Sequence, residues 1–150
     1  MIRNLLFVLI LGLSAACSAA PGNGESLPAL EGTWSITLTQ SGGFAGLQRT
    51  VIIANDGSVV AVDERERRIA ALQLSEAELT GLEEQLSAAR VIRPTETETG
   101  CADCFIYDLR IDSASESFSI QLDDVTLPDS GLQPLVANVR DLMERALATQ

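Results

Sequence analysis

The sequence predicts an α+β domain in which two helices pack on a mostly antiparallel sheet of about six strands. Six short segments are β-branched or alternate apolar with polar residues, which is typical of half-buried strands. Two further segments repeat apolar residues at helical spacing, and turn residues separate neighbouring strands. The elements therefore follow in the order ββββαββα, and the chain contains no internal repeat.

The first four strands precede residue 75. Trp34, Ile36 and Leu38 alternate with polar residues, and a β-branched run follows a glycine-rich loop. Residues 55–58, Asn-Asp-Gly-Ser, give a strong tight-turn signal, and residues 65–68 form a charged turn. We expect these strands at residues 33–40, 47–54, 59–63 and 69–74.

The second half begins with a helix. Ser75 and Glu78 have the spacing of a capping box, and leucines then recur at helical spacing. Residues 94–100 form a polar loop before two alternating strands, and Pro134 is compatible with the first turn of a closing helix. We expect helices at residues 76–89 and 134–147, and strands at residues 105–111 and 118–122.

The N-terminal residues have the features of an export signal. Arg3 precedes an apolar run at residues 5–13, which is too short to span a bilayer, and small residues then precede Cys17. This arrangement resembles a bacterial lipoprotein signal, in which the cysteine is lipidated. Ser14 departs from that pattern, so ordinary cleavage near Ala16 or Ala19, with secretion, stays an alternative.

Three regions follow from this signal. Residues 1–16 are predicted to be a signal peptide, and residues 17–30 a lipidated cysteine with a flexible tether rich in Ser, Ala, Gly and Pro. Residues 31–150 are predicted to form the single α+β domain, since the chain is long enough for one compact core. We therefore expect an exported protein that is anchored to a membrane of the bacterial envelope through Cys17.

Composition excludes several function classes. The net charge is −11, and removal of residues 1–16 with Arg3 makes it −12, so the surface repels phosphate backbones and argues against nucleic-acid binding. The chain has no lysine and no histidine, hence no histidine base or metal ligand and no lysine nucleophile. The acidic pairs at residues 83–84 and 123–124 and the run at residues 95–99 suit solvated surfaces. We expect no catalytic residue, metal or cofactor.

Cys101 and Cys104 are open to three interpretations. A redox pair normally begins a helix, whereas this pair precedes a strand and has Asp103 inside the ring, which disfavours a thiolate. A zinc site would need carboxylates as its other ligands. The third interpretation is a short structural disulfide that holds the loop onto the strand; it leaves Cys17 as the odd cysteine of three, which lipidation would account for.

The segment between the first two strands carries three glycines around one aromatic residue. Glycine permits positive φ angles and close backbone approach, as in a loop that presents a side chain to a partner. The alternative is a simple hairpin connection in which Phe44 turns inward and covers the core. The candidate partner-binding residues are Ser41, Gly42, Gly43, Phe44, Ala45, Gly46 and Leu47.

Four stretches of the chain carry a family resemblance: residues 41–46, 105–109, 124–128 and 132–136. Together they resemble the emfourin family of small proteinaceous inhibitors of protealysin and other thermolysin-like metallopeptidases, and the resemblance runs from about residue 32 to residue 147. The export signal and the cysteine pair are departures, because ordinary emfourins are intracellular. The family pattern also suits Asp124 as a residue that bonds the turn before Leu127 and Pro128.

The resemblance implies a function without chemistry of its own. Phe44 or Leu47 would occupy the apolar pocket beside the scissile bond of an exported thermolysin-like metallopeptidase, and the metal would belong to that target. The acidic surface would steer the domain toward a basic rim. The alternative is a non-inhibitory envelope lipoprotein that acts as a binding or scaffold module.

Overall fold

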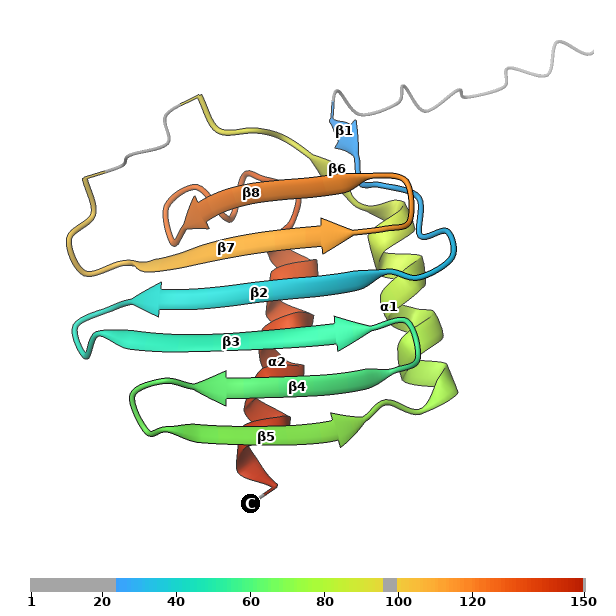
Figure 1. The fold of residues 1–150 in the computed structure, drawn as a ribbon. Helices are drawn as coiled ribbons and strands as arrows, with labels where there is room; N and C mark the ends of the chain where they lie inside the picture. Colours follow the sequence, from blue (N-terminus) through green and yellow to red (C-terminus); the bar gives the residue numbers. More distant parts are fainter. Residues whose placement is uncertain (1–23, 96–99, 150) are drawn as a thin grey trace, which may run out of the picture.

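The computed structural model describes residues 24–95 and 100–149, which form a six-stranded antiparallel sheet, two helices and a separate two-stranded ribbon (Figure 1). The strand order of the large sheet is β5-β4-β3-β2-β7-β8. The predicted α+β fold is confirmed, with the ribbon as an addition. The sheet contains β2 (Ser35–Gly42), β3 (Leu47–Ala54), β4 (Ser58–Asp63), β5 (Arg68–Gln73), β7 (Phe105–Asp112) and β8 (Ser117–Asp123).

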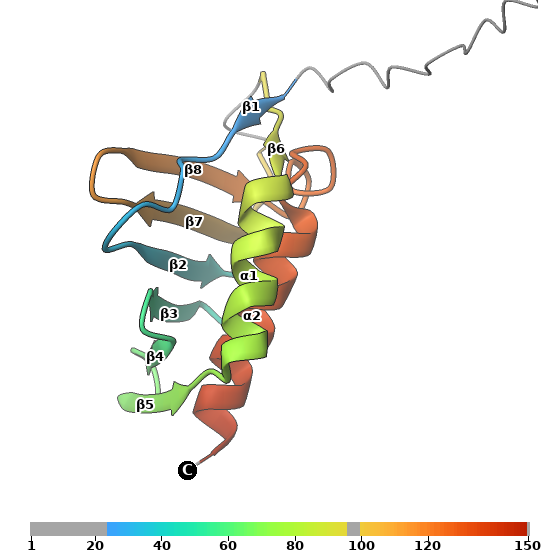
Figure 2. The same cartoon turned by 90° about the vertical axis from the view of Figure 1, so that its right-hand side faces the viewer.

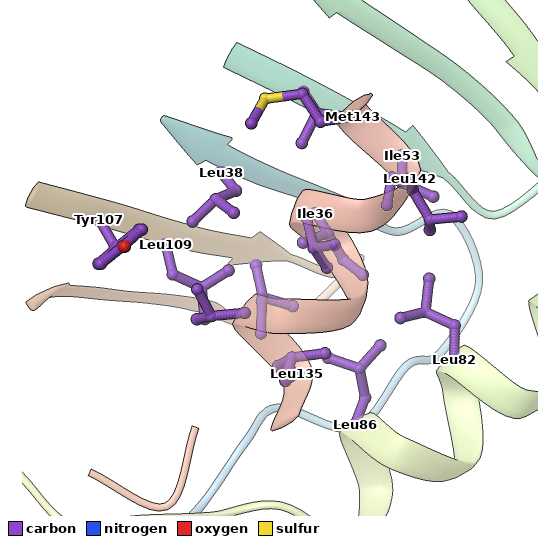
Figure 3. Close-up of a cluster of buried hydrophobic side chains, with 14 of the residues drawn as sticks. Ile36, Leu38, Ile53, Leu82, Leu86, Tyr107, Leu109, Leu135, Leu142 and Met143 are labelled. Atoms are coloured by element: carbon purple, nitrogen blue, oxygen red, sulfur yellow. The ribbon is translucent and has the colours of Figure 1, made fainter. Parts of the chain in front are cut away.

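Both helices lie on the same side of this sheet (Figure 2). Helix α2 (Gln133–Ala148) crosses β2, β3, β4 and β5, and α1 (Glu76–Ala88) packs beside α2. Figure 3 shows the resulting core, in which side chains of both helices point toward the central strands. The buried residues that it labels are Ile36, Leu38, Ile53, Leu82, Leu86, Tyr107, Leu109, Leu135, Leu142 and Met143.

Register explains why alternate residues of the sheet are buried. Ile36 lies opposite Ile53 on one neighbouring strand and Ile111 on the other, and all three side chains are fully buried. Thr37 and Thr39 alternate with these apolar residues and face away from the helices. Because side chains alternate with a period of two, a slip of one residue would expose the whole apolar set.

Helix α1 begins where the sequence predicts. The Ser75 hydroxyl accepts a hydrogen bond from the Glu78 amide, and the Glu78 carboxylate accepts one from the Ser75 amide, so the capping box is confirmed. Arg145 of α2 also donates to Glu78 at 2.8 Å. The bonds from Ser75, backbone first, and from Arg145 lower the pKa of Glu78 to about 2. Glu78 thus links the start of α1 to the end of α2.

The fold begins earlier than residue 31. Glu25–Ser26 forms β1, which pairs with β6 (Arg90–Val91), and Leu27 is buried in the core. Leu27 and Leu30 therefore pack on the core, within a segment whose composition predicts a tether. Short strands of two residues carry no periodic pattern, so the sequence could not reveal them.

Several predicted features lie outside the described residues. These are the signal peptide at residues 1–16, Cys17, the start of the tether and residues 96–99 of the acidic run. Within residues 24–95 and 100–149, no helix has the length and apolar character needed to cross a membrane.

Candidate functional site

The glycine-rich segment forms the turn between β2 and β3, here named the tip (residues 43–46). Pairing of the two strands continues to Gly42 and Leu47, so β2 extends two residues beyond the predicted strand end. Phe44 is 97% exposed. Of the two orientations that the sequence left open, outward toward a partner or inward over the core, the structure has the outward one. Leu47 is half-buried at the base, so Phe44 is the large apolar side chain of the tip that is accessible to a partner.

The glycines are needed because the neighbouring chain approaches closely. Gly42 and Gly43 have φ angles of 88° and 69°, in the left-handed region. A Cβ on Gly42 would lie 2.6 Å from the Cys104 carbonyl oxygen, and one on Gly43 would lie 2.5 Å from the Phe105 ring. Within the turn, the Gly46 amide donates to the Gly43 carbonyl at 3.0 Å. Side chains at Gly42 or Gly43 would therefore displace the tip.

A disulfide-closed segment supports one side of the tip. Cys101 and Cys104 are bonded to each other, with their Cα atoms 5.5 Å apart, and β7 begins at the next residue. This agrees with the third interpretation of the pair, a structural disulfide ahead of a strand. The Gly43 amide donates to the Cys104 carbonyl at 3.0 Å. The disulfide ring and the tip are therefore directly joined.

Asp124 holds the start of β7. Its two carboxylate oxygens accept from the Phe105 amide at 2.7 Å and from the Tyr107 hydroxyl at 2.8 Å. Burial of Tyr107 and its hydrogen bond to Asp124 raise the pKa of Tyr107 to about 12, so the hydroxyl remains a donor at physiological pH. Asp124 thus fixes the strand on which Gly42 and Gly43 rest.

The turn after β8 uses the neighbouring aspartate instead. Asp123 accepts from the amides of Val125 and Thr126 at 3.1 and 2.8 Å, the role that was expected of Asp124. The expectation for Asp124 is wrong because β8 ends at Asp123, so the next side chain points toward β7. Asp123 thus stabilises the turn after β8, and Asp124 stabilises the start of β7.

The turn between β4 and β5 supports the other side of the tip. The Arg65 guanidinium donates to the Ala45 carbonyl, and the Glu64 amide donates to the Gln48 carbonyl at 3.0 Å. Arg67 has a φ of 53°, a backbone conformation that is uncommon for residues other than glycine. The tip is consequently held between two flanking segments while Phe44 projects from it.

A polar row crosses the helix-facing side of the sheet beneath this end. Gln40 lies opposite both Tyr107 and Arg49, and Arg49 lies opposite Asp63. The Arg49 Nε donates to Asp63 at 2.6 Å, and its Nη1 donates to Glu144 of α2 at 2.7 Å. Because the Arg49 bonds join β3 to β4 and to α2, they tie the tip end of the sheet to the helix layer.

The acidic residues that the structure describes do not form a metal-binding cluster. Among residues 24–95 and 100–149, no group of three or more Cys, Asp or Glu side chains is placed to hold a metal ion. A groove of about 540 Å³ on the sheet face opposite the helices contains one carboxylate, Asp108, which accepts from Gln121 at 2.7 Å. The tip is therefore the candidate functional site that the structure supports best.

Sequence reasoning missed the supports of this site. Nothing in the local pattern around Arg65 or Asp124 indicates that either residue reaches the tip or the strand below it. Both contacts depend on the strand order, which places segments about 20 residues apart side by side. The glycine and aromatic signal finds the tip itself, since it reflects local backbone requirements.

Comparison with known families gives one result that covers more than half of the chain. The model of the emfourin family matches residues 59–140, from β4 into α2. The matched region begins after the tip and includes Asp63, the disulfide segment and Asp124. Comparison with curated proteins gives no match. The chain belongs to the emfourin family, a family of proteinaceous inhibitors of protealysin-type proteases.

Proposed function

We propose that this protein inhibits an exported thermolysin-like metallopeptidase by inserting the tip and its flanks, residues 41–47, into the protease cleft. The exposed Phe44 on a supported turn is the observation that carries the proposal. Aromatic side chains contribute much of the binding energy of many protein interfaces, where they fill pockets of the partner. Membership of the emfourin family supplies the protease as the class of partner.

The supports of the tip favour tight binding. Segments that order only on binding lose conformational entropy at that step, which weakens association. Here the Gly43 amide is bonded to Cys104, and the Ala45 carbonyl accepts from Arg65, before any partner is present. Phe44 therefore enters the cleft on a backbone that is already positioned, and no residue of the inhibitor needs to react.

The charge of the domain suits a basic partner surface. The chain has a net charge of −11, and a field of this sign accelerates encounter with a protease whose cleft has a basic rim. Added salt screens such steering, so the association rate should fall with ionic strength while the dissociation rate changes little.

The direct test is an inhibition titration. Residues 17–150 with Cys17→Ser, which carries no lipid, would be added to a panel of thermolysin-like peptidases and to one serine peptidase. We expect activity of at least one metallopeptidase to fall linearly to an equimolar end point, with the serine peptidase unaffected. Unchanged activity across the panel would contradict inhibition and favour the non-inhibitory envelope module.

We further propose that Cys17 is lipidated and anchors the domain to an envelope membrane. The support is the sequence pattern around Cys17 and the pairing of the other two cysteines with each other. The described chain starts beside β1, which lies away from the tip in Figure 1, so an anchor there leaves the tip accessible.

Fractionation tests the anchor. The wild-type protein should be found in the membrane fraction and incorporate labelled palmitate, whereas Cys17→Ser should be soluble and unlabelled. Phe44→Ala is the matched control and should remain in the membrane fraction. A wild-type protein without label that is recovered in the soluble fraction would show ordinary cleavage instead.

A further inference from the structure

The disulfide ring is bonded to the tip and also limits the space available to it. Gly43 donates its amide to the Cys104 carbonyl at 3.0 Å, and that same oxygen occupies the space in which a Cβ of Gly42 would lie. Gly42 is also paired with Phe105, the residue that follows Cys104. The position of the Cys104 backbone thus determines the direction in which the tip leaves the sheet.

Two restraints fix that backbone from opposite sides. On the C-terminal side, the Asp124 carboxylate accepts from the Phe105 amide at 2.7 Å and holds β7 in place. On the N-terminal side, the Cys101–Cys104 bond closes a ring of four residues, and its other three members, Cys101, Ala102 and Asp103, are exposed. Such exposed residues have little packing to order them, so the covalent ring is their principal restraint.

We propose that the Cys101–Cys104 disulfide is a positioning element of the inhibitory surface: it fixes the Cys104 carbonyl beneath Gly43 and so pre-orders the tip that carries Phe44. This inference rests on the proposed function for its inhibitory role. Its structural part, the control of the tip by the disulfide, does not depend on any protease.

Loss of the disulfide would act locally. Asp124 still holds Phe105, and the pairing of β7 with β2 continues over eight residue pairs, so the sheet remains intact. The Phe105 amide that Asp124 holds belongs to the same planar peptide unit as the Cys104 carbonyl, so this oxygen keeps that restraint but loses the one from the ring. The Gly43 amide then has a less fixed acceptor. The tip keeps its bond from Arg65 but is less ordered before it binds, which weakens binding through conformational entropy.

Amide hydrogen exchange tests the structural part on the protein alone. In residues 17–150 with Cys17→Ser, the further double substitution Cys101→Ser and Cys104→Ser should reduce protection of the Gly43 amide about fivefold or more, as expected for loss of one hydrogen bond. The loss of protection at Gly43 should exceed any loss at the Leu38 amide in the centre of β2, which reports the stability of the whole fold. Equal Gly43 protection in both proteins would overturn the inference whether or not a protease is inhibited.

A double-mutant cycle tests the functional part. The Cys101→Ser and Cys104→Ser substitutions should weaken inhibition about fivefold to tenfold when Phe44 is present, and much less in a Phe44→Ala background, because the disulfide acts through the tip. An equal loss in both backgrounds would show that the disulfide does not work through Phe44.

A remote variant separates positioning from general stability. Ile53→Val removes one methylene from a fully buried side chain near the far end of β3, so it lowers stability without touching the tip and should leave inhibition unchanged. If it weakens inhibition as much as the cysteine variant, lowered stability explains the effect and positioning is wrong. If the wild-type chain inhibits no peptidase, the proposed function fails while the exchange experiment still decides the role of the disulfide.

Discussion

Replacing Phe44 with alanine is expected to weaken inhibition about a hundredfold without lowering stability. The side chain is 97% exposed, so its removal leaves no cavity and breaks no core contact. Substitutions at such positions usually change the free energy of unfolding by less than about 0.5 kcal/mol. In the complex the same ring is proposed to fill an apolar pocket, where truncation of an aromatic anchor has a large effect.

Inhibition titrations and thermal unfolding of the same preparations measure the two effects separately. Phe44→Leu keeps a bulky apolar side chain and should retain most of the inhibition. Ile92→Ala is the matched surface control, because Ile92 is 55% exposed and follows β6 rather than the tip. If Phe44→Ala inhibits fully and Ile92→Ala loses inhibition, the interface does not lie at the tip.

Local chemistry made most of the elements predictable. The alternation around Ile36 and Leu38 required one buried face, and that face is buried against α2. Gly57 has a φ of 79° in the turn that its Asn-Asp-Gly sequence predicted, and the Ser58 amide donates to Asp56 as such turns require. These features depend on residues within a few positions of each other, which a single sequence displays.

Strand neighbours and the small ribbon were not predictable in the same way. β2 lies between β3 and β7, and β7 begins more than 60 residues after β2 ends. Several alternating strands satisfy the same burial pattern, so alternation alone does not select which of them pair. Glu25 and Ser26 carry no apolar pattern, and their pairing with β6 follows from the burial of Leu27 beside them.

In the candidate site, too, local features were predictable from the sequence and long-range contacts were not. Glycine spacing around Phe44 predicted a loop that presents a side chain, because positive φ angles are a local demand. The supports from Cys104 and Arg65 are long-range contacts and left no local trace in the sequence. The turn role expected of Asp124 belongs to Asp123 for the same reason, since only the end of β8 distinguishes two identical neighbours.

Asp63→Ala is expected to lower the free energy of unfolding by about 3 kcal/mol, because it removes one partner of a buried ion pair. Asp63 is 1% exposed, and its carboxylate accepts from Arg49 at 2.6 Å and from the Glu66 amide at 2.9 Å. Alanine leaves the Glu66 amide without this acceptor, while Arg49 keeps only its bond to Glu144. The variant should unfold roughly 10 °C below the wild type.

The charge of Asp63 also predicts a pH dependence. Burial alone would raise its pKa, but the hydrogen bonds from the Glu66 amide and Arg49 outweigh burial and hold the pKa below the ordinary value of 3.8. A carboxylate with a lowered pKa stabilises the fold above its unfolded pKa, and this stabilisation is lost as the pH falls through the folded value. The stability difference between wild type and Asp63→Asn should therefore stay constant near neutral pH and shrink below about pH 3.8.

Denaturant unfolding at several pH values measures this difference, and Glu144→Gln is the matched control. Glu144 also pairs with Arg49, but its side chain is 52% exposed, so its loss should cost less than about 1 kcal/mol. A difference between wild type and Asp63→Asn that grows as the pH falls would contradict the lowered pKa. Equal costs for Asp63→Ala and Glu144→Gln would show that burial of the carboxylate, and with it the polar row beneath the tip, contributes little to the stability of this end of the sheet.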